Sequence, residues 1–181
     1  MDRLYCGCPW WKVGKSGAPE SFRRSLYTKD IEHMFLGQYE HTVDEKGRLT
    51  IPARYRELLE NGAYITQGLE QNLLVLPAIL FDQMRLKIAE TSFTDLKARQ
   101  LRRLIFSGAE LLEIDRAGRI LVPQFLRQAK HLDGAAVIVG AGEYFEIWPV
   151  AEWSEQQKEL LDPVANQERF SGLNLSIQAN G

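Results

Sequence analysis

The clearest pattern along the chain is an alternation of polar and apolar side chains at residues 38–43. Tyr39, His41 and Val43 would lie on one side of an extended chain there, and three polar side chains would lie on the other. Alternation with a period of two predicts a half-buried β-strand. Short apolar segments that are rich in leucine or β-branched residues predict further strands at 48–51, 63–67 and 73–76.

A nine-residue segment occurs twice, as DEKGRLTIP at 44–52 and as DRAGRILVP at 115–123. Five pairs are identical at this spacing: Asp44/Asp115, Gly47/Gly118, Arg48/Arg119, Pro52/Pro123 and Arg56/Arg127. Aspartate and glycine predict a turn, because aspartate can bond the backbone two residues on and glycine accepts a positive φ. Proline suits the first turn of a helix, which predicts one over 53–60 in the first copy. The repeat therefore predicts two ββαββ units.

The pattern between and beyond the two copies is helical. Two apolar stripes at helical spacing predict a pair of helices, with Leu80, Phe81, Met84 and Ile88 in the first and Leu101, Leu104 and Ile105 in the second. Thr94 is the predicted cap of the second helix. A C-terminal helix is predicted over 151–161, where Pro163 closes it before a polar, partly ordered tail.

These elements divide the chain into five segments. They are an N-terminal extension (1–33), a first module (38–80), a helical insert (81–108), a second module (109–152) and a C-terminal helix with its tail (153–181). The extension is expected to be disordered or to follow from an upstream translation start. The whole is predicted to be an α+β protein.

Charge is distributed unevenly along the chain. The formal net charge is -2, and residues 34–181 carry 16 basic against 20 acidic side chains, which by itself argues against a nucleic-acid partner. Residues 44–56 and 115–127 are nevertheless each net +2. The sign of the charge therefore reverses locally on the same element of both copies.

The two arginines that follow the turn glycines are the main candidate for function. Turn geometry explains the repeated aspartate and glycine, but it does not require an arginine at Arg48 and at Arg119. Arginine offers a planar set of donors that suits guanine edges and phosphates. The preceding aspartates, Asp44 and Asp115, are predicted to orient these guanidinium groups by bidentate ion pairs. This pattern favours binding to double-stranded DNA over a purely structural turn.

Residues 34–181 resemble the MraZ family, through the opening MFLG at 34–37 and the motifs DEKGRLTIPARYR and DRAGRILVPQFLR. The resemblance implies two tandem swapped-hairpin modules of the SpoVT-AbrB superfamily that form a pseudo-two-fold β-barrel. It also implies a cytoplasmic, nucleoid-associated regulator that forms a ring-shaped homo-oligomer. Such a regulator would bind short direct repeats in the promoter of the division and cell wall gene cluster.

The same resemblance implies which side chains contact DNA. Those implied most directly are Lys46, Arg48, Arg116 and Arg119. Arg54 and Arg56 would serve either phosphates or helix packing. The second copy has Ala117 where the first has Lys46, so it lacks one of these basic side chains. Asp44, Gly47, Pro52, Asp115, Gly118 and Pro123 are expected to shape the motif rather than to touch DNA.

Two other classes of function remain open. Gly140-Ala141-Gly142 after an apolar run resembles the start of a nucleotide-binding enzyme, but Phe145 stands where the third glycine is expected, and a β-hairpin explains the segment better. An antitoxin-like protein-binding module is the other alternative. Cys6 and Cys8 form half a zinc site at best, and the three histidines are scattered. We therefore predict no enzyme, metal, cofactor or membrane segment.

Overall fold

A computed structural model of the chain describes residues 34–173. The predictions for the extension at 1–33 and for the last part of the tail at 174–181 lie outside the described residues. Cys6 and Cys8 belong to the first of these segments, so the half zinc site also lies outside them.

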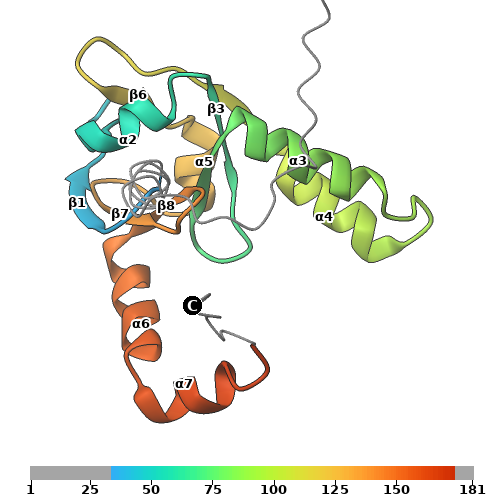
Figure 1. Cartoon of the computed structure of the whole chain (residues 1–181). Coiled ribbons are helices and arrows are strands. Elements are labelled where there is room, and N and C mark those ends of the chain that lie inside the picture. The colour runs from blue at the N-terminus through green and yellow to red at the C-terminus, as the bar shows by residue number, and fades with distance from the viewer. Residues whose placement is uncertain (1–33, 174–181) are drawn as a thin grey trace, which may run out of the picture. The chain divides into compact units, whose positions relative to one another are not determined.

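The ββαββ order is confirmed for both copies (Figure 1). The strands are β1 (Gln38–Thr42), β2 (Arg48–Thr50), β3 (Ala63–Gln67), β4 (Leu73–Pro77), β5 (Glu110–Leu112), β6 (Arg119–Leu121), β7 (Ala135–Gly140) and β8 (Phe145–Pro149). The helices are α2 (Ala53–Leu58), α3 (Ala78–Ala89), α4 (Leu96–Ser107), α5 (Gln124–Ala129), α6 (Val150–Leu160) and α7 (Pro163–Arg169). The fold is a mixed α+β architecture.

The first strand of each copy pairs with the third strand of the other copy. β1 lies antiparallel to β7, with Tyr39 opposite Ile138, and β5 lies antiparallel to β3, with Tyr64 opposite Leu111. β4 pairs with β8, which gives a six-stranded sheet in the order β1-β7-β8-β4-β3-β5. β2 and β6 form a separate two-stranded sheet. The strand order ends at β1 and β5, and no closed barrel occurs among residues 34–173.

One hydrophobic core is built from both copies. Leu49 of β2 and Ile120 of β6 face each other, and both are fully buried. The ring of Tyr55 packs against Phe35 and Phe145, with centroids 4.9 Å and 5.2 Å away. Burial of a large apolar side chain stabilises a fold by roughly 1.5–3 kcal/mol. Because these contacts cross between the copies, we infer that the two copies fold as one unit.

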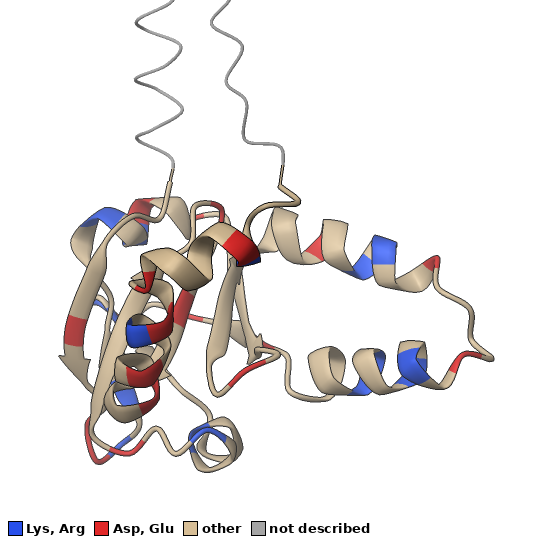
Figure 2. Cartoon of the chain, turned by 90° about the horizontal axis from the view of Figure 1, so that it is seen from below, with Lys and Arg blue, Asp and Glu red and all other residues tan. Residues whose placement is uncertain are grey.

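Helices cover the sheet differently in the two copies. α3 and α4 lie side by side (Figures 1 and 2), and Phe81 and Ile105 join them to Leu76 of β4 in one buried cluster. In the second copy, Trp153 of α6 packs against Trp148 of β8. None of the described helices combines the length and the apolar character that crossing a lipid bilayer requires.

One predicted helix cap is wrong, and one helix was not predicted. The cap of α4 is Asp95, whose carboxylate accepts a hydrogen bond from the amide of Lys97, and not Thr94. A carboxylate is a strong acceptor for the free amides of a first helical turn, so the aspartate takes the position. Pro163 follows the end of α6 as predicted, but it also begins α7, which Asp162 caps in the segment expected to be a weakly ordered tail.

Candidate nucleic-acid interface

The turn before β2 is organised by the side chain of Asp44. Its Oδ1 accepts hydrogen bonds from the amides of Lys46 (3.0 Å) and Arg48 (2.9 Å). The amide of Gly47 donates to the carbonyl oxygen of Asp44 at 2.8 Å, and Gly47 has a φ of 79°. Only glycine adopts this backbone region without strain, so the turn requires the glycine as the sequence predicted.

The turn before β6 repeats this geometry. Oδ1 of Asp115 accepts hydrogen bonds from the amides of Ala117 and Arg119, both at 2.9 Å, and Gly118 has a φ of 75°. Only the backbone amide at position 117 enters the turn. The replacement of a lysine by Ala117 therefore leaves the shape of the second turn unchanged.

Each aspartate also holds the arginine that follows its turn. Oδ2 of Asp44 lies 2.7 Å from both Nε and Nη2 of Arg48, and Oδ2 of Asp115 lies 2.9 Å from Nε and 2.6 Å from Nη2 of Arg119. The ion pairs are present, but the predicted bidentate form is wrong. Both bonds end on one oxygen because the other oxygen already holds two backbone amides.

These contacts fix the charge state of the pairs. Hydrogen bonds from Arg48 lower the pKa of Asp44 from 3.8 to about 2, chiefly through the guanidinium and then through the backbone amide. Arg119 lowers the pKa of Asp115 in the same way. The pKa of Arg119 is raised by its hydrogen bond to Asp115, and Asp44 adds a smaller attraction. The charge of one pair therefore acts on the other.

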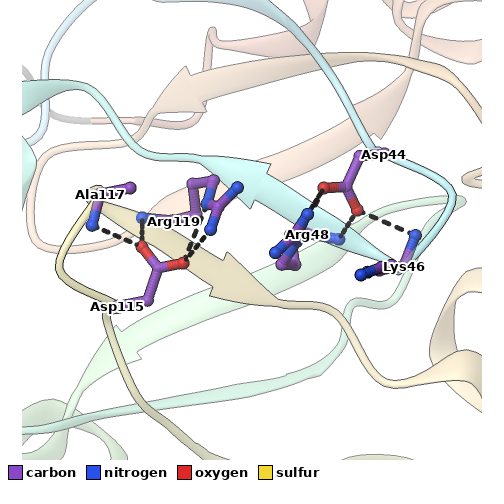
Figure 3. Close-up of polar contacts among 6 residues, drawn as sticks. All are labelled: Asp44, Lys46, Arg48, Asp115, Ala117 and Arg119. Atoms are coloured by element: carbon purple, nitrogen blue, oxygen red, sulfur yellow. Dashed lines mark hydrogen bonds and ion pairs between the residues drawn. The ribbon is translucent and has the colours of Figure 1, made fainter.

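β2 and β6 bring the two pairs together in a short ribbon (Figure 3). Arg48 lies opposite Leu121, and Thr50 lies opposite Arg119. Side chains alternate along a strand, and the central residue of each strand is buried in the core. The side chains of all four residues therefore lie on the outward face of the ribbon. Arg48 and Arg119 keep 34% and 31% of their side chains exposed, so ligands can reach both.

The other predicted DNA contacts lie at different places. Lys46 and Arg116 are exposed in the two turns, next to the ribbon. Arg54 is exposed on α2, outside the ribbon.

Pro52 and Pro123 occupy the cap positions directly before α2 and α5, one residue earlier than the first helical position. Both prolines therefore define the point where each ribbon strand ends and its helix begins.

Arg56 and its repeat counterpart Arg127 reach across to the turn of the other copy. Nε of Arg56 donates to the carbonyl of Ile51 at 2.9 Å, and its guanidinium lies so close to Gly118 that a Cβ there would overlap it. Nε of Arg127 donates to the carbonyl of Val122 at 3.2 Å and lies 2.8 Å from where a Cβ of Gly47 would stand.

These contacts favour helix packing for Arg56, the second of its two predicted roles. They also reveal a role for Arg127 that sequence reasoning did not assign. The sequence did contain a signal for this role, because Arg127 is identical to Arg56 at the equivalent position of the repeat. Backbone bonds connect the same places, from the amide of Ile51 to the carbonyl of Gly118 and from the amide of Val122 to the carbonyl of Gly47. We name these reciprocal contacts the arginine clamps.

Some basic side chains of the insert bond backbone carbonyls, and others are exposed to solvent. Figure 2 shows Lys and Arg on both of its helices. Nη1 of Arg99 donates to the carbonyls of Phe93 and Thr94, and Nη2 of Arg102 donates to carbonyls at the end of α3 and in the following loop. These two arginines close the loop between the helices. Arg103 is exposed on α4.

The segment with the glycine pair is a hairpin. β7 ends at Gly140, the amide of Ala141 donates to the carbonyl of Tyr144, and β8 begins at Phe145. No helix begins after this turn, as a dinucleotide-binding strand would require. Residues 34–173 also contain no cluster of three or more His, Cys, Asp or Glu side chains that would hold a metal.

The fold and the ribbon define a class of duplicated α+β proteins in which two strand-exchanged copies present paired arginines on one face. A family described as "MraZ protein, putative antitoxin-like" matches residues 34–104 and 105–170. The chain belongs to the MraZ family.

Several relatives carry the name "Transcriptional regulator MraZ". The protein of Roseiflexus sp. (strain RS-1) is 43% identical over 120 residues, which cover 66% of this chain and 84% of that protein. The protein of Herpetosiphon aurantiacus is 43% identical over 134 residues, 74% of this chain and 91% of that protein. The protein of Moorella thermoacetica is 45% identical over 129 residues, 71% of this chain and 90% of that protein.

Proposed function

We propose that this protein is a sequence-specific DNA-binding transcriptional regulator that uses the β2–β6 ribbon. The observation that carries the proposal is the pair of aspartate-held arginines, Arg48 and Arg119, on one exposed face of two adjacent antiparallel strands. The relatives named as transcriptional regulators support it. The proposed targets are short direct repeats in the promoter of the division and cell wall gene cluster.

The shape and the donors of the ribbon suit the major groove. That groove is about 12 Å wide and admits a two-stranded ribbon. Asp44 uses only two of the five N–H donors of Arg48, and within residues 34–173 no bond involves Nη1 of either ribbon arginine. These donors would face guanine edges. Lys46 and Arg116, at the turns, would contact phosphates, because they are exposed beside the ribbon.

The aspartates would reduce the entropy that binding costs. A free arginine side chain loses about 2 kcal/mol of rotamer freedom when it is fixed. Asp44 and Asp115 already restrict their arginines in the unbound protein, so part of this cost falls on folding rather than on binding. The arginine clamps extend the same effect to the backbone, since each joins a ribbon turn to the helix of the other copy.

We further propose that the strand exchange reflects a pseudo-two-fold arrangement of two swapped hairpins, in a sheet that stays open at β1 and β5. Its modules would span 38–80 and 109–152, with the insert at 81–108. The reciprocal pairing of β1 with β7 and of β5 with β3 supports this symmetry. The symmetry would place two equivalent half-ribbons against one stretch of duplex.

Assembly into a ring-shaped homo-oligomer would compensate for the acidic charge of each subunit. Several linked ribbons raise the overall affinity through effective concentration. A groove of about 330 Å³ beside Trp153, lined also by Gln38 and Val137, supports a contact between copies. In the first copy α4 joins the buried cluster on the corresponding face, whereas in the second copy α7, which follows α6 as α4 follows α3, contributes no side chain to the cluster of Trp148 and Trp153. The insert of a neighbouring subunit would fill this place. The complex would act on chromosomal DNA in the nucleoid.

Mobility shifts with upstream promoter repeats across a salt series test the proposal. We expect Arg48→Ala and Arg119→Ala each to weaken binding about 5- to 150-fold, the value of a good bidentate base contact. Phosphate contacts predict a linear loss of log affinity with log salt concentration. Arg169→Ala is the matched control, because Arg169 lies on α7, outside both the ribbon and the insert, and pairs with the exposed Glu159 at 3.8 Å.

Unchanged shifts in both ribbon variants would refute the site. If the wild-type protein shifts no promoter fragment more strongly than random duplex, the antitoxin-like alternative replaces the regulator. A protein partner that co-purifies with the wild-type chain and binds it in the absence of DNA would then identify that function.

A further inference from the structure

The outward face of the ribbon contains one residue that neither the repeat nor the ion pairs explain. The strands read Arg-Leu-Thr in β2 and Arg-Ile-Leu in β6, so the third position is Thr50 in one copy and Leu121 in the other. Leu121 is 62% exposed, whereas the residues at the second position are completely buried. The two halves of the ribbon therefore have an arginine at the first position of each strand and different residues at the third position.

Register places Leu121 where bound DNA would lie. It is directly opposite Arg48 and two residues after Arg119 on its own strand. A single exposed leucine needs no explanation by itself. This one neighbours both arginines proposed to contact base edges, Arg48 across the ribbon and Arg119 along β6, so a duplex that engages both guanidinium groups would also cover it. A functional partner of Leu121 must then be apolar and must lie at the floor of the groove.

We propose that Leu121 determines specificity by packing against the C5-methyl group of thymine, and that Thr50 contacts the equivalent position of the other half-site. The proposal rests on the proposed function. Thymine is the base that displays a methyl group in the major groove, and apolar side chains recognise it there. A leucine covers this methyl group with more apolar surface than a threonine does. The protein therefore distinguishes the two halves of its site, which gives the bound duplex a direction.

The size of the effect follows from the burial of one methyl group. Removing a buried carbon of this kind changes affinity about 4-fold per contact. Arg48 and Arg119 would supply most of the affinity through hydrogen bonds. The contribution of Leu121 therefore concerns the choice of base more than the strength of binding, and in an oligomer it multiplies over the engaged ribbons.

Replacement of thymine by uracil tests the proposal, because it removes the methyl group and leaves the base-pairing groups in place. A duplex is first selected by the wild-type protein from a random-sequence pool, and each thymine is then replaced in turn. We expect uracil at one position per ribbon to weaken wild-type binding about 4-fold. Leu121→Ala should bind the thymine and uracil duplexes equally at that position, and Thr50→Ala should retain the wild-type response there.

Leu121→Thr, which introduces the residue of the first copy, is the second variant. Threonine is β-branched and therefore suits an exposed strand position, and the folding of this variant is checked by its melting temperature. It should respond to uracil less than the wild-type protein does. Two results would overturn the proposal. One is that uracil weakens wild-type binding at no thymine position. The other is that uracil weakens binding by both Leu121 variants as much as it weakens binding by the wild-type protein. A wild-type protein that enriches no sequence from the pool would instead refute the proposed function itself.

Discussion

Substitution of the turn glycines tests the arginine clamps. Gly118 and Gly47 have nearly the same backbone conformation, with φ of 75° and 79°, so alanine strains both turns alike. Their surroundings differ. A Cβ at Gly118 overlaps the guanidinium of Arg56, and a Cβ at Gly47 meets Arg127 at 2.8 Å, a contact that a small shift relieves. Gly118→Ala should therefore destabilise the protein more than Gly47→Ala does.

The expected magnitudes follow from two contributions. A non-glycine residue in the left-handed region costs about 1–2 kcal/mol. Displacing Arg56 also removes the hydrogen bond from its Nε to the carbonyl of Ile51, and a bond with a charged donor contributes about 1.5–3 kcal/mol. Gly118→Ala should thus cost about 2.5–5 kcal/mol. In an Arg56→Ala background that bond is already absent, and the same substitution should cost only about 1–2 kcal/mol.

Urea denaturation of the four proteins of this double-mutant cycle measures the coupling directly. All are compared at one protomer concentration, because assembly shifts apparent stability. A coupling of about 1.5–3 kcal/mol between Gly118→Ala and Arg56→Ala is expected. The reasoning is wrong if the two substitutions are additive, or if Gly47→Ala and Gly118→Ala destabilise the protein equally.

Two further predictions concern single side chains. Arg48→Ala should raise the pKa of Asp44 from about 2 toward 3.8 in a carboxyl NMR titration; because folding lowers this pKa, its stabilisation is complete above about pH 4 and is lost as pH falls toward 2. Tyr55→Phe removes a hydrogen bond to the carbonyl of Leu36, to which Tyr39 also donates, so urea denaturation should show a loss of only about 1 kcal/mol. A pKa of Asp44 that stays near 2, or a tyrosine variant that loses several kcal/mol, would contradict these assignments.

Local chemistry made much of the fold predictable from the sequence. The duplicated aspartate, glycine and proline specify a turn and a helix start through bonds within a few residues, and both turns form as predicted. The exchange of β1 and β5 between copies was not predictable from local pattern. The partner of each strand lies far along the chain, and alternation identifies a buried face without identifying a neighbour.

The site was predictable to a similar depth. The repeat singled out Arg48 and Arg119, and the structure brings them onto one face. The repeat could not separate these arginines from Arg56, because residue type alone does not show whether a guanidinium faces solvent or packs against a glycine of the other copy. The choice of Asp95 over Thr94 as the cap of α4 is a similar case, since both residues are good caps and only backbone geometry decides between them.

Photo-cross-linking to a duplex that carries a diazirine on its thymine bases, which also reacts with aliphatic side chains, followed by peptide mapping, tests the central claim most directly. The account predicts that cross-links concentrate in residues 44–50 and 115–121, and that those in the second segment include Leu121 or its neighbours. Cross-links confined to the basic helices of the insert, with none in either segment, would contradict it.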